Sequence, residues 1–155
     1  MKKRQERVKD ISLEERITHL LNELRIVLPG TEALLGFQFA SVFTDQFQKL
    51  SFDLRVIHLI SLCFILLSII FLLAAPAFNR IVEPNKATLR FHNFASRVII
   101  LALFFLACGM SIELYVVGMV IMSSPPIALT LSVVSFLLCM SLWFGYSLVN
   151  RNKED

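Results

Sequence analysis

Three uninterrupted apolar blocks constrain this chain more than any other feature of its sequence. They run over Val56–Phe78, Val98–Val120 and Ile127–Val149, and each has 23 residues. A helix of that length is about 35 Å long, which is enough to cross a hydrocarbon core of about 30 Å with some tilt. The composition agrees, because 56% of the residues are hydrophobic and only 17% are charged. The sequence therefore predicts an all-α polytopic membrane protein.

A shorter apolar block over Ile26–Phe43 decides between three and four spans. It has 18 residues and several of them are polar, so hydropathy alone does not settle its place. If it crosses, seven basic residues in the N-tail, four in the central loop and two in the C-tail lie on one side. Those 13 then face only Lys49 and Arg55 on the other side. Because Lys and Arg accumulate in cytoplasmic loops, we expect a four-helix bundle with both termini in the cytoplasm of a bacterial inner membrane.

The sequence divides into a charged tail over residues 1–25, a transmembrane domain over 26–149 and a C-tail over 150–155. Ser12 and Glu15 form a capping-box pattern, which predicts a helix start. The helix is expected to be amphipathic and to end or kink at Pro29-Gly30. It would lie in the cytoplasmic interface or pack on the cytoplasmic loops. Its apolar face consists of Ile17, Leu20, Leu21, Leu24 and Leu28.

Polar side chains inside the spans are the candidate site. Glu32 and Glu113 each cost about 2.5 to 3.5 kcal/mol if they are central and charged. Such a carboxyl is either a proton- or cation-coupled site or a structural hydrogen-bonding group. Counted along their helices, Glu32 and Glu113 differ in depth by about 13 Å, so direct pairing is not expected. Gln38 lies at a depth similar to that of Glu113, and we predict that these two side chains meet.

The remaining candidates predict no metal or cofactor site. His19, His58 and His92 fall in different regions of the expected topology and are not expected to converge on one metal. Each of the three cysteines lies alone in an apolar block, which is typical of a small residue that packs between helices. Small residues in the last block predict a helix–helix or subunit contact; they are Ser135, Cys139, Ser141 and Gly145.

Two sequence patches carry a resemblance to a known family. They are LLNELRIVLPG over residues 20–30 and LLAAPAFNR over residues 72–80. In order and spacing, the match extends over residues 20–115. The chain resembles a family of small bacterial integral membrane proteins of unknown function. The resemblance implies four spans and a polar N-terminal tail, and it implies no activity or catalytic residue.

The function classes follow from these features. No nucleophile–base pair, H-E-x-x-H sequence or glycine-rich phosphate loop is present, so an enzyme is not expected. A net charge of +3 without a basic stripe does not favour nucleic-acid binding. The leading hypothesis is a non-enzymatic accessory or interaction subunit, and the alternative is a small oligomeric proton- or cation-coupled transporter that uses Glu32 and Glu113. Besides the lipid bilayer, the partners considered are a second copy of the chain and a cytoplasmic or membrane protein.

Overall fold

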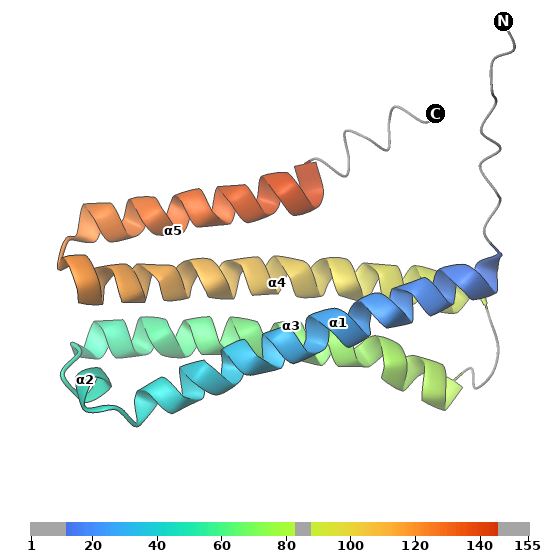
Figure 1. Cartoon of the computed structure of the whole chain (residues 1–155), viewed down its shortest axis with the longest axis horizontal. Coiled ribbons are helices and arrows are strands. Elements are labelled where there is room, and N and C mark those ends of the chain that lie inside the picture. The colour runs from blue at the N-terminus through green and yellow to red at the C-terminus, as the bar shows by residue number, and fades with distance from the viewer. Residues whose placement is uncertain (1–11, 83–87, 146–155) are drawn as a thin grey trace, which may run out of the picture.

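The computed structural model describes residues 12–82 and 88–145, and these residues form helices joined by short turns (Figure 1). Residues 1–11, 83–87 and 146–155 lie outside the described part, which leaves out the first 11 residues of the predicted N-tail and all of the predicted C-tail. The elements in chain order are α1 (Leu13–Val42), α2 (Asp45–Gln48), α3 (Phe52–Val82), α4 (Leu89–Met122), α5 (Pro125–Met140) and the π-helical turn η1 (Ser141–Gly145).

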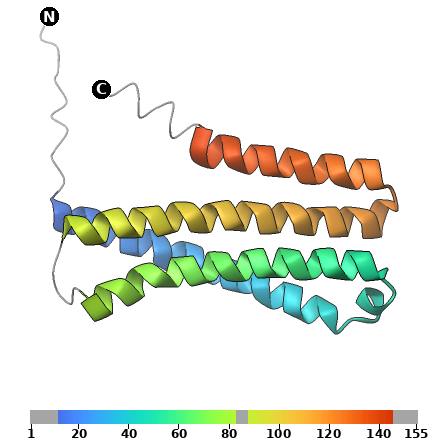
Figure 2. The same ribbon diagram turned by 180° about the vertical axis from the view of Figure 1, so that it is seen from behind.

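The long helices run alternately up and down. Helices α3 and α4 form the central pair, α1 crosses them on one side and contacts both, and α5 packs on the other side of α4 (Figures 1 and 2). The start of α1, the end of α3 and the start of α4 lie toward one end, which we call the basic end. The end of α1, the short helix α2, the start of α3 and the turn between α4 and α5 lie at the opposite end, which we call the loop end.

Local sequence signals account for the helix boundaries. Ser12 accepts a hydrogen bond from the backbone of Glu15, and the Glu15 carboxylate accepts one from the backbone of Ser12, so the predicted capping box is confirmed. Thr88 caps α4 in a related way through the backbone N–H of Phe91. Helix α4 ends at Ser123, which takes a left-handed conformation with φ of 51°, and Pro125 then occupies the first position of α5.

The predicted end of the helix at Pro29-Gly30 is wrong, because α1 continues through these residues as one helix of 30 residues, whereas the alternative of a kink there stays a prediction. Proline removes one backbone donor and crowds the carbonyl four residues earlier. Packing on both sides of Pro29 offsets this cost, since Leu24 and Thr31 are both buried. The predicted separate N-terminal helix and the predicted span over residues 26–43 are therefore two halves of a single element.

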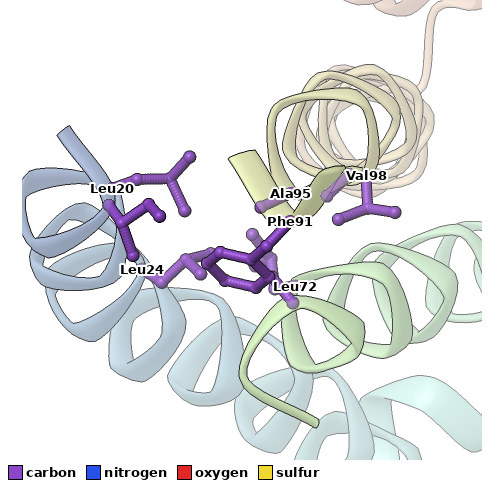
Figure 3. Packing of buried hydrophobic residues seen from close by; sticks show 9 residues of the cluster. Leu20, Leu24, Leu72, Phe91, Ala95 and Val98 are labelled. Carbon is purple, nitrogen blue, oxygen red and sulfur yellow. The ribbon is translucent and has the colours of Figure 1, made fainter. Parts of the chain in front are cut away.

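At the basic end, the apolar face of α1 packs against α3 and α4 (Figure 3). Leu20 and Leu24 lie against Leu72 of α3 and Phe91 of α4, and Phe91 is fully buried. This face was predicted to lie in the membrane interface or on the cytoplasmic loops. It forms the larger hydrophobic core of the described residues, where it joins α1 to the central pair, and its place relative to a membrane stays a prediction.

Small side chains let α3 and α4 approach closely. A Cβ added at Gly109 of α4 would lie 2.5 Å from Ile65 Cγ1 and 3.2 Å from the carbonyl oxygen of Ser61. The Ser61 hydroxyl donates to the Gly109 carbonyl at 2.8 Å, and Ser68 donates to the Ala102 carbonyl at the same distance. Small residues with serine hydrogen bonds to the facing backbone are typical of packing between membrane helices.

Helix α5 packs mainly on α4, and most of its apolar surface is uncovered. Ala128 is its only buried residue, and it lies where Gly118 leaves room for it. Leu129, Leu137 and Leu138 are each more than half exposed. So much exposed apolar surface on a long helix fits a hydrocarbon environment better than water.

Three helical segments are long and apolar enough to cross a membrane: Phe52–Val82, Leu89–Met122 and Pro125–Gly145. The first two extend beyond the predicted spans over residues 56–78 and 98–120, because polar residues at their ends continue the helix. The third begins two residues before the predicted span over 127–149, whose last four residues lie outside the described part. Helix α1 is not among the segments that meet these criteria.

Candidate functional site

Gln38, near the end of α1, is the centre of a buried polar cluster. Its side-chain amide nitrogen donates to Glu113 Oε2 of α4 at 3.0 Å and to Ser61 Oγ of α3 at 2.8 Å. Only 6% of Gln38 is exposed. The predicted contact between Gln38 and Glu113 is thus confirmed, and it connects the three helices α1, α3 and α4.

His58 of α3 completes the cluster and is almost fully buried. Its Nδ1 lies 3.0 Å from both carboxylate oxygens of Glu113. Its Nε2 faces the backbone carbonyl of Gln38 at 3.3 Å and the hydroxyl of Ser41 at 3.5 Å. The ring of Phe47 in α2 packs edge-on against the imidazole at a centroid distance of 5.0 Å. We call Gln38, Ser41, His58, Ser61 and Glu113 the polar cluster.

The directions of the hydrogen bonds follow from the donor inventory. Ser61 gives its proton to the Gly109 carbonyl, so it accepts from Gln38. Ser41 gives its proton to the Gln38 carbonyl at 2.7 Å, so its oxygen is an acceptor toward His58. Both groups at His58 Nε2 are therefore acceptors, and Nε2 must carry a proton to bond with either of them.

The contact between His58 and Glu113 also needs a proton. A deprotonated Nδ1 facing an ionised carboxylate would place two acceptors 3.0 Å apart, so the observed contact requires a proton on Nδ1 or on the carboxyl. When Nε2 is protonated as well, the pair holds one proton more than a neutral imidazole beside a carboxylate. Such a proton belongs to the pair and not to either residue. The arrangement can bind and release one proton.

Two grooves adjoin Glu113. The first, which we call the side groove, has a volume of about 320 Å³ and lies between α1 and α4, with Ile65 of α3 at its base. The second, which we call the end groove, has a volume of about 180 Å³ and runs from His58 and Glu113 past Phe47 to Thr44 and Gln46 at the loop end. Glu113 and Ser41 line both grooves. The polar cluster is therefore reachable from the side of the bundle and from its loop end.

Glu32 is not part of this site. It is exposed on the surface of α1, and among the described residues it has no ion pair or side-chain hydrogen bond. In particular, it makes no ion pair with Arg25 or Arg80. Gln38 lies six residues, about 9 Å, beyond Glu32 along α1, and Glu113 meets Gln38, so Glu32 and Glu113 are not neighbours.

His58 is the member of the polar cluster that was not predicted to join Gln38 and Glu113. The predicted span over residues 56–78 places His58 at its start, close to the membrane surface. The helix begins four residues earlier, at Phe52, so His58 lies about 9 Å inside it. The available signal was a single titratable residue inside the apolar sequence Val56-Ile57-His58-Leu59-Ile60.

The polar cluster does not have the composition of a metal centre. Within residues 12–82 and 88–145, no three His, Cys, Asp or Glu side chains gather closely enough to hold a metal ion. Cys63, Cys108 and Cys139 are all unpaired. The chemistry that this site offers is proton binding, charge and hydrogen bonding.

The fold and the composition together define a helical membrane protein, with three long apolar helices and a buried polar cluster between two of them and α1. The chain belongs to a family whose function is unknown, described as "Family of unknown function (DUF6328)", which matches residues 7–147. The predicted membership of a family of unknown function is therefore confirmed. Neither the curated proteins nor the solved structures contain a match to this chain.

Proposed function

We propose that this chain is a four-span protein of a bacterial inner membrane, with both termini in the cytoplasm. Helix α1 is about 45 Å long and runs beside α3 and α4 toward the loop end. Two of the polar residues that lower its hydropathy, Thr31 and Gln38, are buried against other helices and not directed to lipid. The described basic residues at the loop end are Lys49 and Arg55, whereas Arg16, Arg25, Arg80, Arg90 and Arg97 lie toward the basic end. This distribution favours a cytoplasmic basic end.

We further propose that the protein binds and releases a proton at the His58–Glu113 pair, as a proton-coupled membrane protein. The observation that carries this proposal is the placement of His58 between acceptors, with the carboxylate of Glu113 at one ring nitrogen and the oxygens of Gln38 and Ser41 at the other. A side-chain pair with one shared proton is electrically neutral, which lowers the cost of holding two ionisable groups between membrane helices.

Ser41 offers a route for releasing this proton. When the pair loses the proton, one ring nitrogen of His58 becomes an acceptor. The Ser41 hydroxyl, 3.5 Å from Nε2, can then rotate away from the Gln38 carbonyl and donate to the ring. The end groove leads from this point to Thr44 and Gln46, so the released proton has a path to water at the loop end.

Proton flux in proteoliposomes tests the proposal. A vesicle-trapped pH indicator reports proton movement down an imposed gradient. We expect flux above that of empty vesicles, and we expect Glu113→Gln and His58→Gln to reduce it to the empty-vesicle level. Ser68→Ala is the matched control, because Ser68 makes a similar buried contact one helix turn or more away from the cluster. Unchanged flux in both cluster variants would contradict the proposal.

A second candidate function, an interaction subunit without transport, is favoured by the exposed apolar surface of α5. Only Ala128 of this helix is buried, so a second copy or another membrane protein could pack on it in place of lipid. Crosslinking in the membrane from cysteines placed at Leu137 and Leu138 would test this candidate. Specific crosslinked species that persist when Glu113 is replaced would support an interaction role separate from the proton site.

A further inference from the structure

The side groove has an apolar wall with one ionisable group in it. Its lining is apolar apart from Gln38, Ser41 and Glu113, and it includes no Lys or Arg. The apolar residues come from α1, α3 and α4; they are Leu34, Phe37, Ile65, Met110, Leu114 and Val117. A carboxylate at the edge of an aromatic and thioether-lined groove suits a cation with an apolar body, because the body is buried while the charge meets Glu113.

The charge balance of the His58–Glu113 pair shows when such a cation would be held. With its proton, the pair is neutral. Without it, His58 is neutral and Glu113 carries an uncompensated negative charge between membrane helices, which is costly. A monovalent cation in the side groove would restore neutrality, as the proton did. Proton and cation therefore compete for the same negative charge.

The surroundings of the pair favour this competition. Gln38 Oε1 is buried and has no hydrogen-bond partner among the described residues, so the polar cluster contains an unsatisfied carbonyl dipole. Toward His58, α1 presents Gln38 and Ser41, α2 presents Phe47 and α4 presents Glu113. The other charged residues of the described loop end make no ion pair with His58 or Glu113; they are Asp45, Lys49, Asp53 and Arg55.

We propose that the side groove binds a lipophilic monovalent organic cation beside Glu113 in exchange for the proton of the His58–Glu113 pair. This inference rests on the proposed proton site and adds the class of its ligand. One cation enters as one proton leaves through the end groove to water, so charge is conserved at the site. A divalent or strongly hydrated inorganic cation does not fit, because the groove offers it one carboxylate and an apolar wall.

Calorimetric binding of tetraphenylphosphonium to the full chain in mild detergent tests this exchange. Titrations in two buffers of different ionisation enthalpy count the protons released. We expect about one proton released per cation bound. Where the pair holds its proton, we also expect the Kd to rise about tenfold for each unit that the pH falls, as one-proton linkage requires. Glu113→Gln should weaken binding at least tenfold, whereas Glu32→Gln, which removes an exposed carboxylate, should bind as the unmodified chain does.

A second variant separates this inference from the proton site itself. Leu114→Trp fills the side groove without replacing any member of the polar cluster, so it should block cation binding while His58 and Glu113 still titrate together in NMR spectra. Cation binding without proton release would overturn the exchange. No binding to the unmodified chain, with His58 and Glu113 titrating together, would overturn the inference and leave the proton site standing. No binding and no joint titration would overturn both.

Discussion

His58 Nδ1 lies 3.0 Å from each carboxylate oxygen of Glu113, and this contact joins the first third of α3 to the second half of α4. Glu113 is about 14 Å from the end of α4 and His58 is about 9 Å from the start of α3, so the pair lies in the half of the bundle toward the loop end. A proton site at this depth is close to one surface and is separated from the other by most of the helix length. Its connection to the loop end through the end groove follows from that position.

Glu32 and Glu113 are expected to differ sharply in function. Glu32→Gln should leave proton flux within about twofold of the unmodified chain, because the Glu32 side chain is exposed and contacts no member of the polar cluster. Glu113→Gln should abolish flux, because an amide cannot share a proton with His58. Flux measured in parallel proteoliposomes compares the two. A larger loss of proton flux in Glu32→Gln than in Glu113→Gln would show that the functional carboxylate is on α1 and not on α4, and would contradict the proposal.

Ser61 and Ser68 make equivalent hydrogen bonds to α4 but have different neighbours. Each donates to a backbone carbonyl of α4 at 2.8 Å, and only Ser61 also accepts from Gln38. Replacing either by alanine should lower the free energy of unfolding by about 0.5 to 1.7 kcal/mol. Only Ser61→Ala should also alter the NMR signals of His58, because it releases one of the two bonds that orient Gln38. Equal effects of the two variants on His58 would show that Gln38 is not held by Ser61.

Gly109 and Gly36 provide a matched pair for the packing of α3 on α4. An alanine Cβ at Gly109 would collide with Ile65 and approach the Ser61 carbonyl, whereas a Cβ at Gly36 has nothing within 4 Å. Gly109→Ala should therefore destabilise the protein by about 1 to 3 kcal/mol, as overpacking does. Gly36→Ala should be neutral or slightly stabilising, because alanine favours helix over glycine by about 1 kcal/mol or less. Thermal unfolding in the same detergent ranks the two variants, and a reversed ranking would contradict the close approach of the helices.

Cysteine labelling tests the four-span topology. In a background where the three native cysteines are replaced by alanine, Gln48→Cys reports the loop end and Ile81→Cys reports the basic end. A membrane-impermeant maleimide applied to intact cells should label position 48, and it should label position 81 only after permeabilisation. The opposite pattern would reverse the orientation, and labelling of both positions in intact cells would contradict a span between them.

The sequence was sufficient to predict the helical class, the apolar helices and the contact between Gln38 and Glu113. Hydropathy and length identify long apolar helices because the bilayer thickness sets their size. The Gln38–Glu113 contact was predictable because both residues can be placed by depth along their helices. The continuity of α1 was not predictable in this way, since the packing of Leu24 and Thr31 that supports the helix on either side of Pro29 is a tertiary effect.

His58 shows why the remainder of the site was missed. A shift of four residues in the start of α3 moves this histidine from the membrane surface to a buried position, and boundaries are the part of a helix that sequence patterns define least well. The roles of Ser41 and Ser61 depend on which backbone carbonyls face them. Such partners are set by the crossing of α1 over the central pair and leave no signal in the sequence.

Joint NMR titration of His58 and Glu113 in lipid bilayers tests the central claim most directly. The ring nitrogens of ¹⁵N-labelled histidine and the carboxyl carbon of ¹³C-labelled glutamate report the two halves of the pair, with His58→Gln and Glu113→Gln used to assign the signals. We predict that both signals change at one shared midpoint with the release of one proton per chain, because the proton belongs to the pair. Two separate midpoints, or a His58 signal that is the same in Glu113→Gln as in the unmodified chain, would contradict a shared proton site.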